Sequence, residues 1–151
     1  MSNNEVISIL ERLIETCQKG RDTFRSAAES IQNSEFRRLF NIFSQQRTQF
    51  ITELKGEAHR LGGEGNIESE GTAELPSNTI PFRNPASPKP GGVRDEGSVI
   101  AECQSEEEAA VNEYQEALKA DLPLDVQYVV KRQYMDIKDA YDRIRILQRA
   151  A

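Results

Sequence analysis

Apolar residues recur at steps of three and four in two long segments, one on each side of a stretch rich in proline and glycine. Because an α-helix turns once every 3.6 residues, such steps place the apolar side chains on one face. The pattern predicts helices over residues 3–32 and 34–62, and again over 98–120 and 123–149. The breaks between paired helices are short, so each pair should fold as an antiparallel hairpin.

Several residues mark the expected helix ends. Ser2, Asn3 or Asn4 can cap the first helix, and either Asp95 or Ser98 can cap the third. The pair Gly62-Gly63 should end the second helix, with one glycine in the left-handed conformation. Gly20 lies on the apolar stripe of the first helix, where it indicates either close packing of another helix or simple tolerance of a weak helix former.

The crossover over residues 63–97 holds five of the six prolines, which forbid a regular helix across its second half. It is long enough to run the length of a bundle, or to return the second hairpin to the starting end, so length alone allows two topologies. Ile80 and Phe82 are its expected anchors on the bundle surface. We predict one all-α domain over residues 1–151, a ferritin-like four-helix bundle of two hairpins joined by this crossover.

The charge and composition of the chain argue against some classes of binding partner. A net charge of −6 argues against nucleic acid, which calls for a basic surface. The sequence shows neither a signal peptide nor a run of about 18 apolar residues, so we expect a cytoplasmic protein with no membrane partner. Cys17 and Cys103 have no metal-ligand spacing and are expected to be small buried apolar residues.

Several strings carry a resemblance to a known family. LIETCQKGRDTFRSAAES, FITELKGEAHRLGG and the segment from VIAECQSEEEAAVNEYQ to YDRIRILQ resemble a bacterial group of small ferritin-like proteins catalogued as a domain of unknown function. The resemblance covers both hairpins and implies a ferritin-like bundle without a defined activity. The chain departs from that group in its proline-rich crossover and at Tyr141, where many members have histidine.

A ferritin-like di-iron site takes a Glu from each of two helices and Glu-x-x-His from the other two. The sequence contains no Glu-x-x-His, and its single histidine, His59, follows Glu57 by two residues and so lies on another helix face. We therefore expect no cofactor. The alternative is iron or manganese in an asymmetric carboxylate site built from Glu107, Glu57 and either Glu15 or His59.

Polar residues interrupt the inner stripes at Arg47, Glu57, Glu107 and Gln133. For Glu107 we favour a place at the edge of the stripe, from which the carboxylate reaches water. A buried pair with Arg47, a hydrogen bond from Tyr141, and metal ligation stay open. Arg47, Gln133 and Tyr141 are thus candidates for a buried polar network, and Glu57, near a helix end, is expected to be exposed.

No catalytic pattern accompanies these residues, since the sequence lacks a nucleophile motif and a phosphate-binding loop. We predict a non-enzymatic bundle that acts through a protein partner or as a homo-oligomer, in a stress response. The competing hypothesis is the metal-binding protein described above. A third hypothesis makes the crossover a docking segment.

Overall fold

The computed structural model of the chain describes residues 2–63 and 95–150. Within these ranges the chain forms long helices and one π-helical turn, and no strand. They are α1 (Asn3–Ser30), α2 (Ser34–Ala58), η1 (His59–Gly63), α5 (Glu96–Leu118) and α6 (Leu124–Ala150). The predicted all-α four-helix fold is confirmed. Ile80 and Phe82, the expected crossover anchors, lie outside the described residues.

Side-chain caps fix where the first hairpin begins and turns. Ser2 Oγ accepts a hydrogen bond from the backbone N–H of Glu5, and the Glu5 carboxylate accepts one from the Ser2 N–H. The Asn33 side chain accepts from the backbone N–H groups of Glu35 and Phe36. These bonds satisfy donors that would otherwise lack partners in the first turns of α1 and α2.

Helix ends differ from the predicted ones by a few residues, for local reasons. α1 stops at Ser30 because Ile31 turns to an extended conformation and buries its side chain in the core. Regular α-helix ends at Ala58, where η1 continues the chain. Within η1, Gly62 has a φ of 99°, which confirms a left-handed glycine at this end. The Asp95 carboxylate caps α5, so this helix starts at Glu96.

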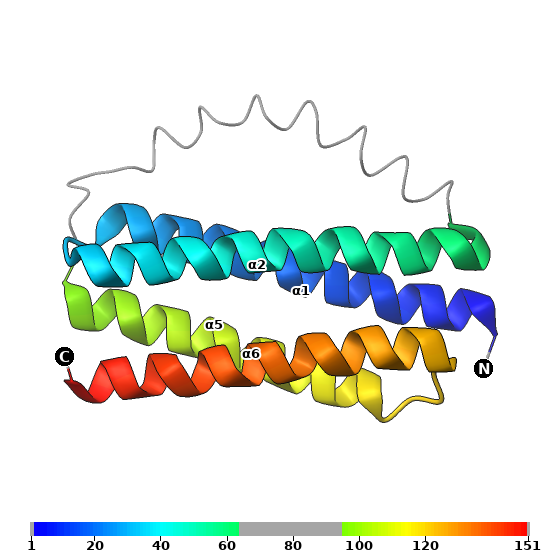
Figure 1. Cartoon of the computed structure of the whole chain (residues 1–151). Coiled ribbons are helices and arrows are strands. Elements are labelled where there is room, and N and C mark those ends of the chain that lie inside the picture. The colour runs from blue at the N-terminus through cyan, green and yellow to red at the C-terminus, as the bar shows by residue number, and fades with distance from the viewer. Residues whose placement is uncertain (1, 64–94, 151) are drawn as a thin grey trace.

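The helix directions decide between the two topologies (Figure 1). α1 and α6 run one way along the bundle, and α2 and α5 run the other way. The end of η1 and the start of α5 therefore lie at opposite ends of the bundle. This is the arrangement with one long crossover connection, as in ferritin-like folds.

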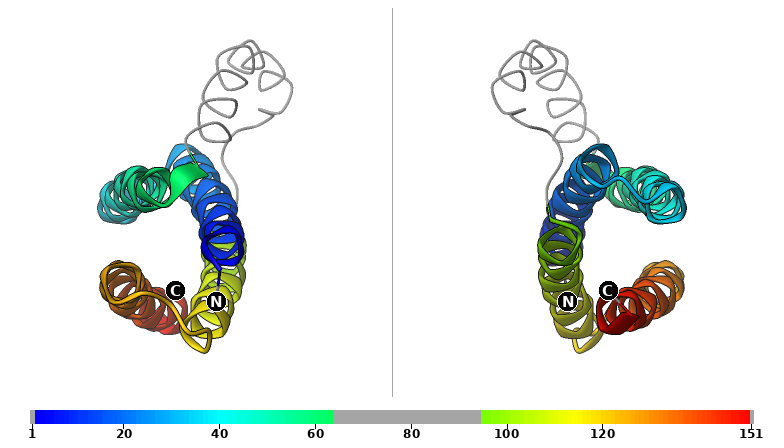
Figure 2. Two further views of the ribbon diagram at one scale, coloured as in Figure 1. Left: turned by 90° about the vertical axis from the view of Figure 1, so that its right-hand side faces the viewer. Right: turned by 90° about the vertical axis from the view of Figure 1, so that its left-hand side faces the viewer.

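Seen along its axis, the bundle has the order α2, α1, α5, α6 (Figure 2). α1 contacts both α2 and α5, whereas α6 contacts α5 extensively and α2 over a smaller area. α2 and α5 are consequently diagonal partners, which can touch only through long side chains that cross the centre.

The core has two apolar clusters, one toward each end of the bundle. One cluster contains Leu10, Leu13, Leu54, Val126 and Val130, and the other contains Phe24, Phe40, Phe43, Ile100 and Ile144. Each of these helices contributes buried apolar residues to the core. None of the described helices combines the length and the apolarity that a bilayer crossing requires.

Gly20 of α1 is buried against Arg47 of α2. A Cβ added to Gly20 would lie 3.6 Å from the Arg47 Cγ, an ordinary van der Waals contact. Another helix therefore packs closely here, yet the space admits one methyl group.

We predict that Gly20→Ala raises the free energy of unfolding by up to ~1 kcal/mol, because alanine forms helix better than glycine. Gly20→Leu should lower it, since the larger side chain would displace Arg47. Urea unfolding followed by circular dichroism at the helical band measures both changes. A destabilising alanine would show that the site has no room for a Cβ.

Candidate functional site

An ion pair joins the two diagonal helices at the centre of the bundle. Arg47 comes from α2 and Glu107 from α5, and both are fully enclosed, with side-chain exposures of 1% and 0%. Arg47 Nη1 donates to Glu107 Oε1 at 3.0 Å, and Nη2 donates to Oε2 of the same carboxylate. The fork of the guanidinium thus engages both carboxylate oxygens, which is the strongest geometry for such a pair.

The rest of the Arg47 side chain lies among apolar groups. Its guanidinium carbon is 5.3 Å from the ring centroid of Phe24 and 5.9 Å from that of Phe50. These distances are within the range of cation–π attraction. Among the described residues, Arg47 Nε has no hydrogen-bond acceptor. The buried cation is therefore held by one carboxylate and two aromatic rings.

A second set of polar groups runs beside the ion pair. The Tyr114 hydroxyl of α5 donates to Gln133 Oε1 of α6 at 2.6 Å. Because that proton is committed to Gln133, the Cys17 thiol of α1 donates to the Tyr114 oxygen, at an S···O distance of 3.1 Å. The thiol, phenol and amide form a directed chain of hydrogen bonds across three helices.

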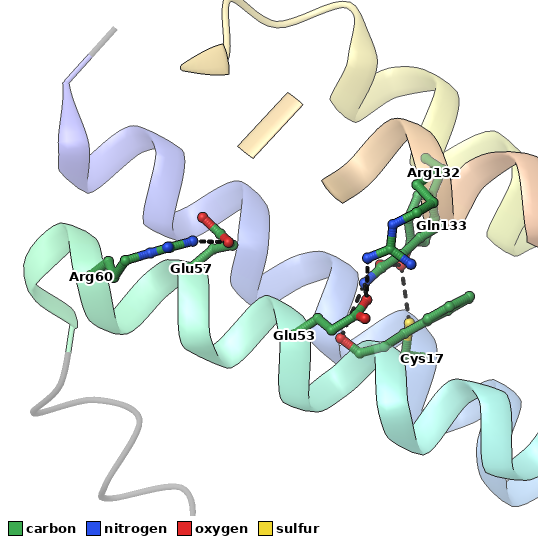
Figure 3. A network of polar contacts seen from close by, with 8 residues as sticks. Cys17, Glu53, Glu57, Arg60, Arg132 and Gln133 are labelled. Atoms are coloured by element: carbon green, nitrogen blue, oxygen red, sulfur yellow. Dashed lines mark hydrogen bonds and ion pairs between the residues drawn. The ribbon is translucent and has the colours of Figure 1, made fainter. Parts of the chain in front are cut away.

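Gln133 carries this chain to the fourth helix. Its amide nitrogen donates to the Phe50 carbonyl at 3.3 Å and to Glu53 Oε1 at 2.8 Å, both on α2. Arg132 of α6 pairs with the same Glu53 carboxylate at 3.0 Å (Figure 3). The side of the bundle between α2 and α6 is thus joined by polar contacts. We call Arg47, Glu107, Cys17, Tyr114 and Gln133 the central polar layer.

Burial dominates the proton affinities in the layer. It raises the pKa of the Cys17 thiol from 9.0 to about 11. It also raises the pKa of Tyr114 well above 10.0. Both groups stay protonated at neutral pH, so neither offers a ready nucleophile or an anionic ligand. Burial raises the pKa of Glu107 to about 7, against the opposing charge of Arg47.

Some of the residues predicted to form a buried polar network lie in the central polar layer, and others do not. Arg47 and Gln133 lie in the layer. The favoured placement of Glu107 at a solvated stripe edge is wrong, because this residue is completely buried, and its pairing with Arg47 is the alternative that the structure shows. Tyr141 is half-buried with its ring 5.7 Å from the Arg145 guanidinium carbon, and Tyr114 supplies the phenol of the layer instead.

The four metal-ligand candidates do not come together. Glu57 lies ten residues beyond Arg47 on α2, about 15 Å along the helix, and pairs with Arg60 (Figure 3). Its expected exposure is wrong, since Glu57 is buried. Glu15 and His59 are exposed. Within residues 2–63 and 95–150, no three His, Cys, Asp or Glu side chains are grouped so that they could hold a metal.

Sequence reasoning did not propose Tyr114 for the polar network, and it expected Cys17 to be a small buried apolar residue. A signal for Tyr114 was available, because a tyrosine on an inner stripe must find a partner for its hydroxyl. Gln133, also on an inner stripe, is that partner. Cys17 gave no comparable signal, because a buried thiol needs no hydrogen bond.

Comparisons with known proteins agree with this fold. The family model described as Domain of unknown function (DUF2383) matches residues 5–120. A similar solved structure is that of a two-domain protein from Anabaena variabilis, which contains DJ-1/ThiJ/PfpI-like and ferritin-like domains. The TM-score is 0.79 at 14% identity, over 99% of this chain and 40% of that chain. The chain thus spans well under half of that protein, and the likeness shows the fold alone. No curated protein matches the sequence.

We predict that Glu107→Ala lowers the free energy of unfolding by about 3–5 kcal/mol, because it leaves the Arg47 charge buried without a partner. The double variant Arg47→Met with Glu107→Leu removes both charges at similar volume. It should be as stable as the natural chain, or about 1–4 kcal/mol more stable. Urea unfolding measures the stability of these two variants and of Arg47→Met alone, and so gives the coupling free energy between the two charges. A double variant as unstable as Glu107→Ala would contradict the prediction.

The raised pKa of Glu107 also predicts a pH dependence. The folded protein holds this proton up to about pH 7, whereas the unfolded chain releases it near its ordinary value of 4.5. The contribution of Glu107 to the free energy of unfolding therefore falls as the pH rises from 4.5 to about 7. Above about pH 7 this contribution no longer changes with pH. Subtracting the unfolding free energy of Glu107→Gln at each pH isolates this contribution. A difference that grew with pH over the same window would contradict the prediction.

Proposed function

Because the chain belongs to the family described as Domain of unknown function (DUF2383), we propose its function from its own central layer. We propose a non-enzymatic ferritin-like bundle that acts through protein contacts or self-association. The observation that carries the proposal is the Arg47–Glu107 pair, which puts a protein cation at the centre of the bundle. A four-helix bundle of this type builds a metal centre from inward-facing side chains on facing helices.

The donor set of the layer supports this proposal over the metal-binding one. Both oxygens of Glu107 are engaged by Arg47, whose fixed positive charge would repel a divalent ion at the same place. Cys17 and Tyr114 keep their protons at neutral pH, because burial raises the pKa of each. The amide of Gln133 is bonded through both its oxygen and its nitrogen. Each of the five side chains of the central polar layer thus has a hydrogen-bond partner within the protein, although Arg47 Nε itself has none among the described residues.

The same features argue against a reaction at this site. A nucleophilic thiol needs a lowered pKa and access to substrate, and Cys17 has a raised pKa and 1% exposure. The outer groove between α1 and α5 is lined by Ile9, Arg12, Leu13, Glu113, Glu116 and Ala117. Its two acids are paired with Arg12 and with Lys119. These features are typical of a scaffold whose charges stabilise helices.

Metal analysis tests the proposal against its competitor. The natural chain, Glu107→Ala and Glu108→Ala are purified from cells grown with added iron and manganese, and metal per chain is measured by mass spectrometry. Glu108 is the matched control, because it neighbours Glu107 and is exposed. We expect the same content, far below one ion per chain, in all three proteins. About one iron or manganese per chain that is lost in Glu107→Ala and kept in Glu108→Ala would overturn the proposal.

A further inference from the structure

α6 carries a second apolar stripe on its outer surface. Four of the five large apolar side chains that are strongly exposed in the described part of the chain lie on this helix. Leu124, Tyr128, Met135 and Ile146 are between 61% and 80% exposed. They follow one another at steps of four, seven and eleven residues, each close to a whole number of helical turns. They therefore form one stripe along the helix, which we call the outer stripe.

The outer stripe points away from the bundle. The buried residues of α6, which include Val126, Val130, Ile137 and Ile144, lie on the opposite side of the helix. α6 is also a terminal helix in the order around the bundle, so its outer side faces no other described helix (Figure 2). A helix that serves only one core is polar on its outer side. Single exposed apolar residues are common, but four in one line indicate a contact surface.

The charges between the apolar residues indicate which partner fits. Counted from Met135, Lys131 and Asp139 are equally distant along the chain, and so are Tyr128 and Asp142. If two α6 helices lie antiparallel about a two-fold axis at Met135, each Lys131 is therefore level with an Asp139 of the other copy. Each Tyr128 hydroxyl is level with an Asp142 carboxylate. All four side chains are exposed, and Asp139 also forms an ion pair with Arg143 of its own helix at 3.2 Å.

The ends of the stripe follow the same symmetry. Leu124 and Ile146 are equally distant from Met135, so an antiparallel pair sets apolar against apolar at both ends. Asp125 and Arg145, farther from the stripe, are also equally distant from Met135 and carry opposite charges. Arg132 and Lys138 would be level with like charges, but Arg132 is bound to Glu53. A parallel pair would instead set every charge against its own copy, which is unfavourable.

We infer that the outer stripe of α6 docks a second copy of this chain, antiparallel and two-fold symmetric about Met135. The inference deepens the proposed function, on which it rests, by naming the surface and the partner of self-association. An interface of this kind is isologous, because the same surface serves both copies. A contact between one helix of about 40 Å and its copy belongs to the small, reversible class of interfaces.

Sedimentation velocity over a wide range of protein concentrations tests the surface. Met135→Glu would place two carboxylates face to face at the two-fold axis and should weaken dimerisation at least about tenfold. Ile42→Glu is the matched control, because Ile42 is the exposed apolar residue of α2 and is 51% exposed. We expect the control to dimerise as the natural chain does. Circular dichroism confirms that the variants remain folded.

Charge exchange tests the register. Lys131→Asp should weaken the dimer by like-charge repulsion, and adding Asp139→Lys should restore it by reversing both members of the pair. A natural chain that stays monomeric, a Met135→Glu dimer as tight as the natural one, or a charge exchange without restoration would each overturn the inference. If the stripe variants still dimerise, the inferred surface is wrong, but self-association as the proposed function stands. If the protein binds metal, the proposed function is contradicted and the inferred surface is not. The two failures are therefore distinguishable.

Discussion

A buried charge that cannot be removed is the constraint on which this bundle depends. A guanidinium keeps its proton at any pH at which proteins stay folded, so Arg47 must find a counter-charge inside the core. Glu107 provides it from the diagonal helix, and Phe24 and Phe50 enclose it from the two apolar clusters. The position of α2 relative to α5 is thereby set by a bond with a defined direction. The apolar contacts on either side are less selective, because similar side chains can exchange places.

The hydrogen-bonded chain beside the ion pair extends this control to the other two helices. Cys17, Tyr114 and Gln133 come from α1, α5 and α6, and Gln133 ends the chain on the α2 backbone. Each of these bonds joins two groups at one relative position of their helices, so a helix that slid by one turn would leave buried donors and acceptors unpaired. Such losses cost about 1–3 kcal/mol for each group. A layer of this kind favours one packing over alternatives that bury as much apolar surface.

Much of the fold, and less of the site, was readable from the sequence. Periodicity, caps and the Gly62-Gly63 pair depend on neighbours along the chain, so the four helices and one left-handed glycine in this pair were predicted. How deeply the Glu107 side chain is buried depends on which helix lies diagonally opposite α5. The spacing of apolar residues does not say which helix that is. Glu57 was misjudged for a related reason, because closeness to a helix end did not prevent its burial. Which phenol enters the layer, Tyr114 or Tyr141, also depends on three-dimensional register.

The diagonal position of the ion pair has a consequence for the order of folding. Arg47 and Glu107 are sixty residues apart and belong to different hairpins, whereas the turns within each hairpin join near neighbours. Local contacts close faster than distant ones, because shorter loops lose less entropy. Each hairpin can therefore form first, and the two charges lose their water only when the hairpins meet. Desolvation of this pair belongs to the docking step, so substitutions here should change how fast the two halves assemble.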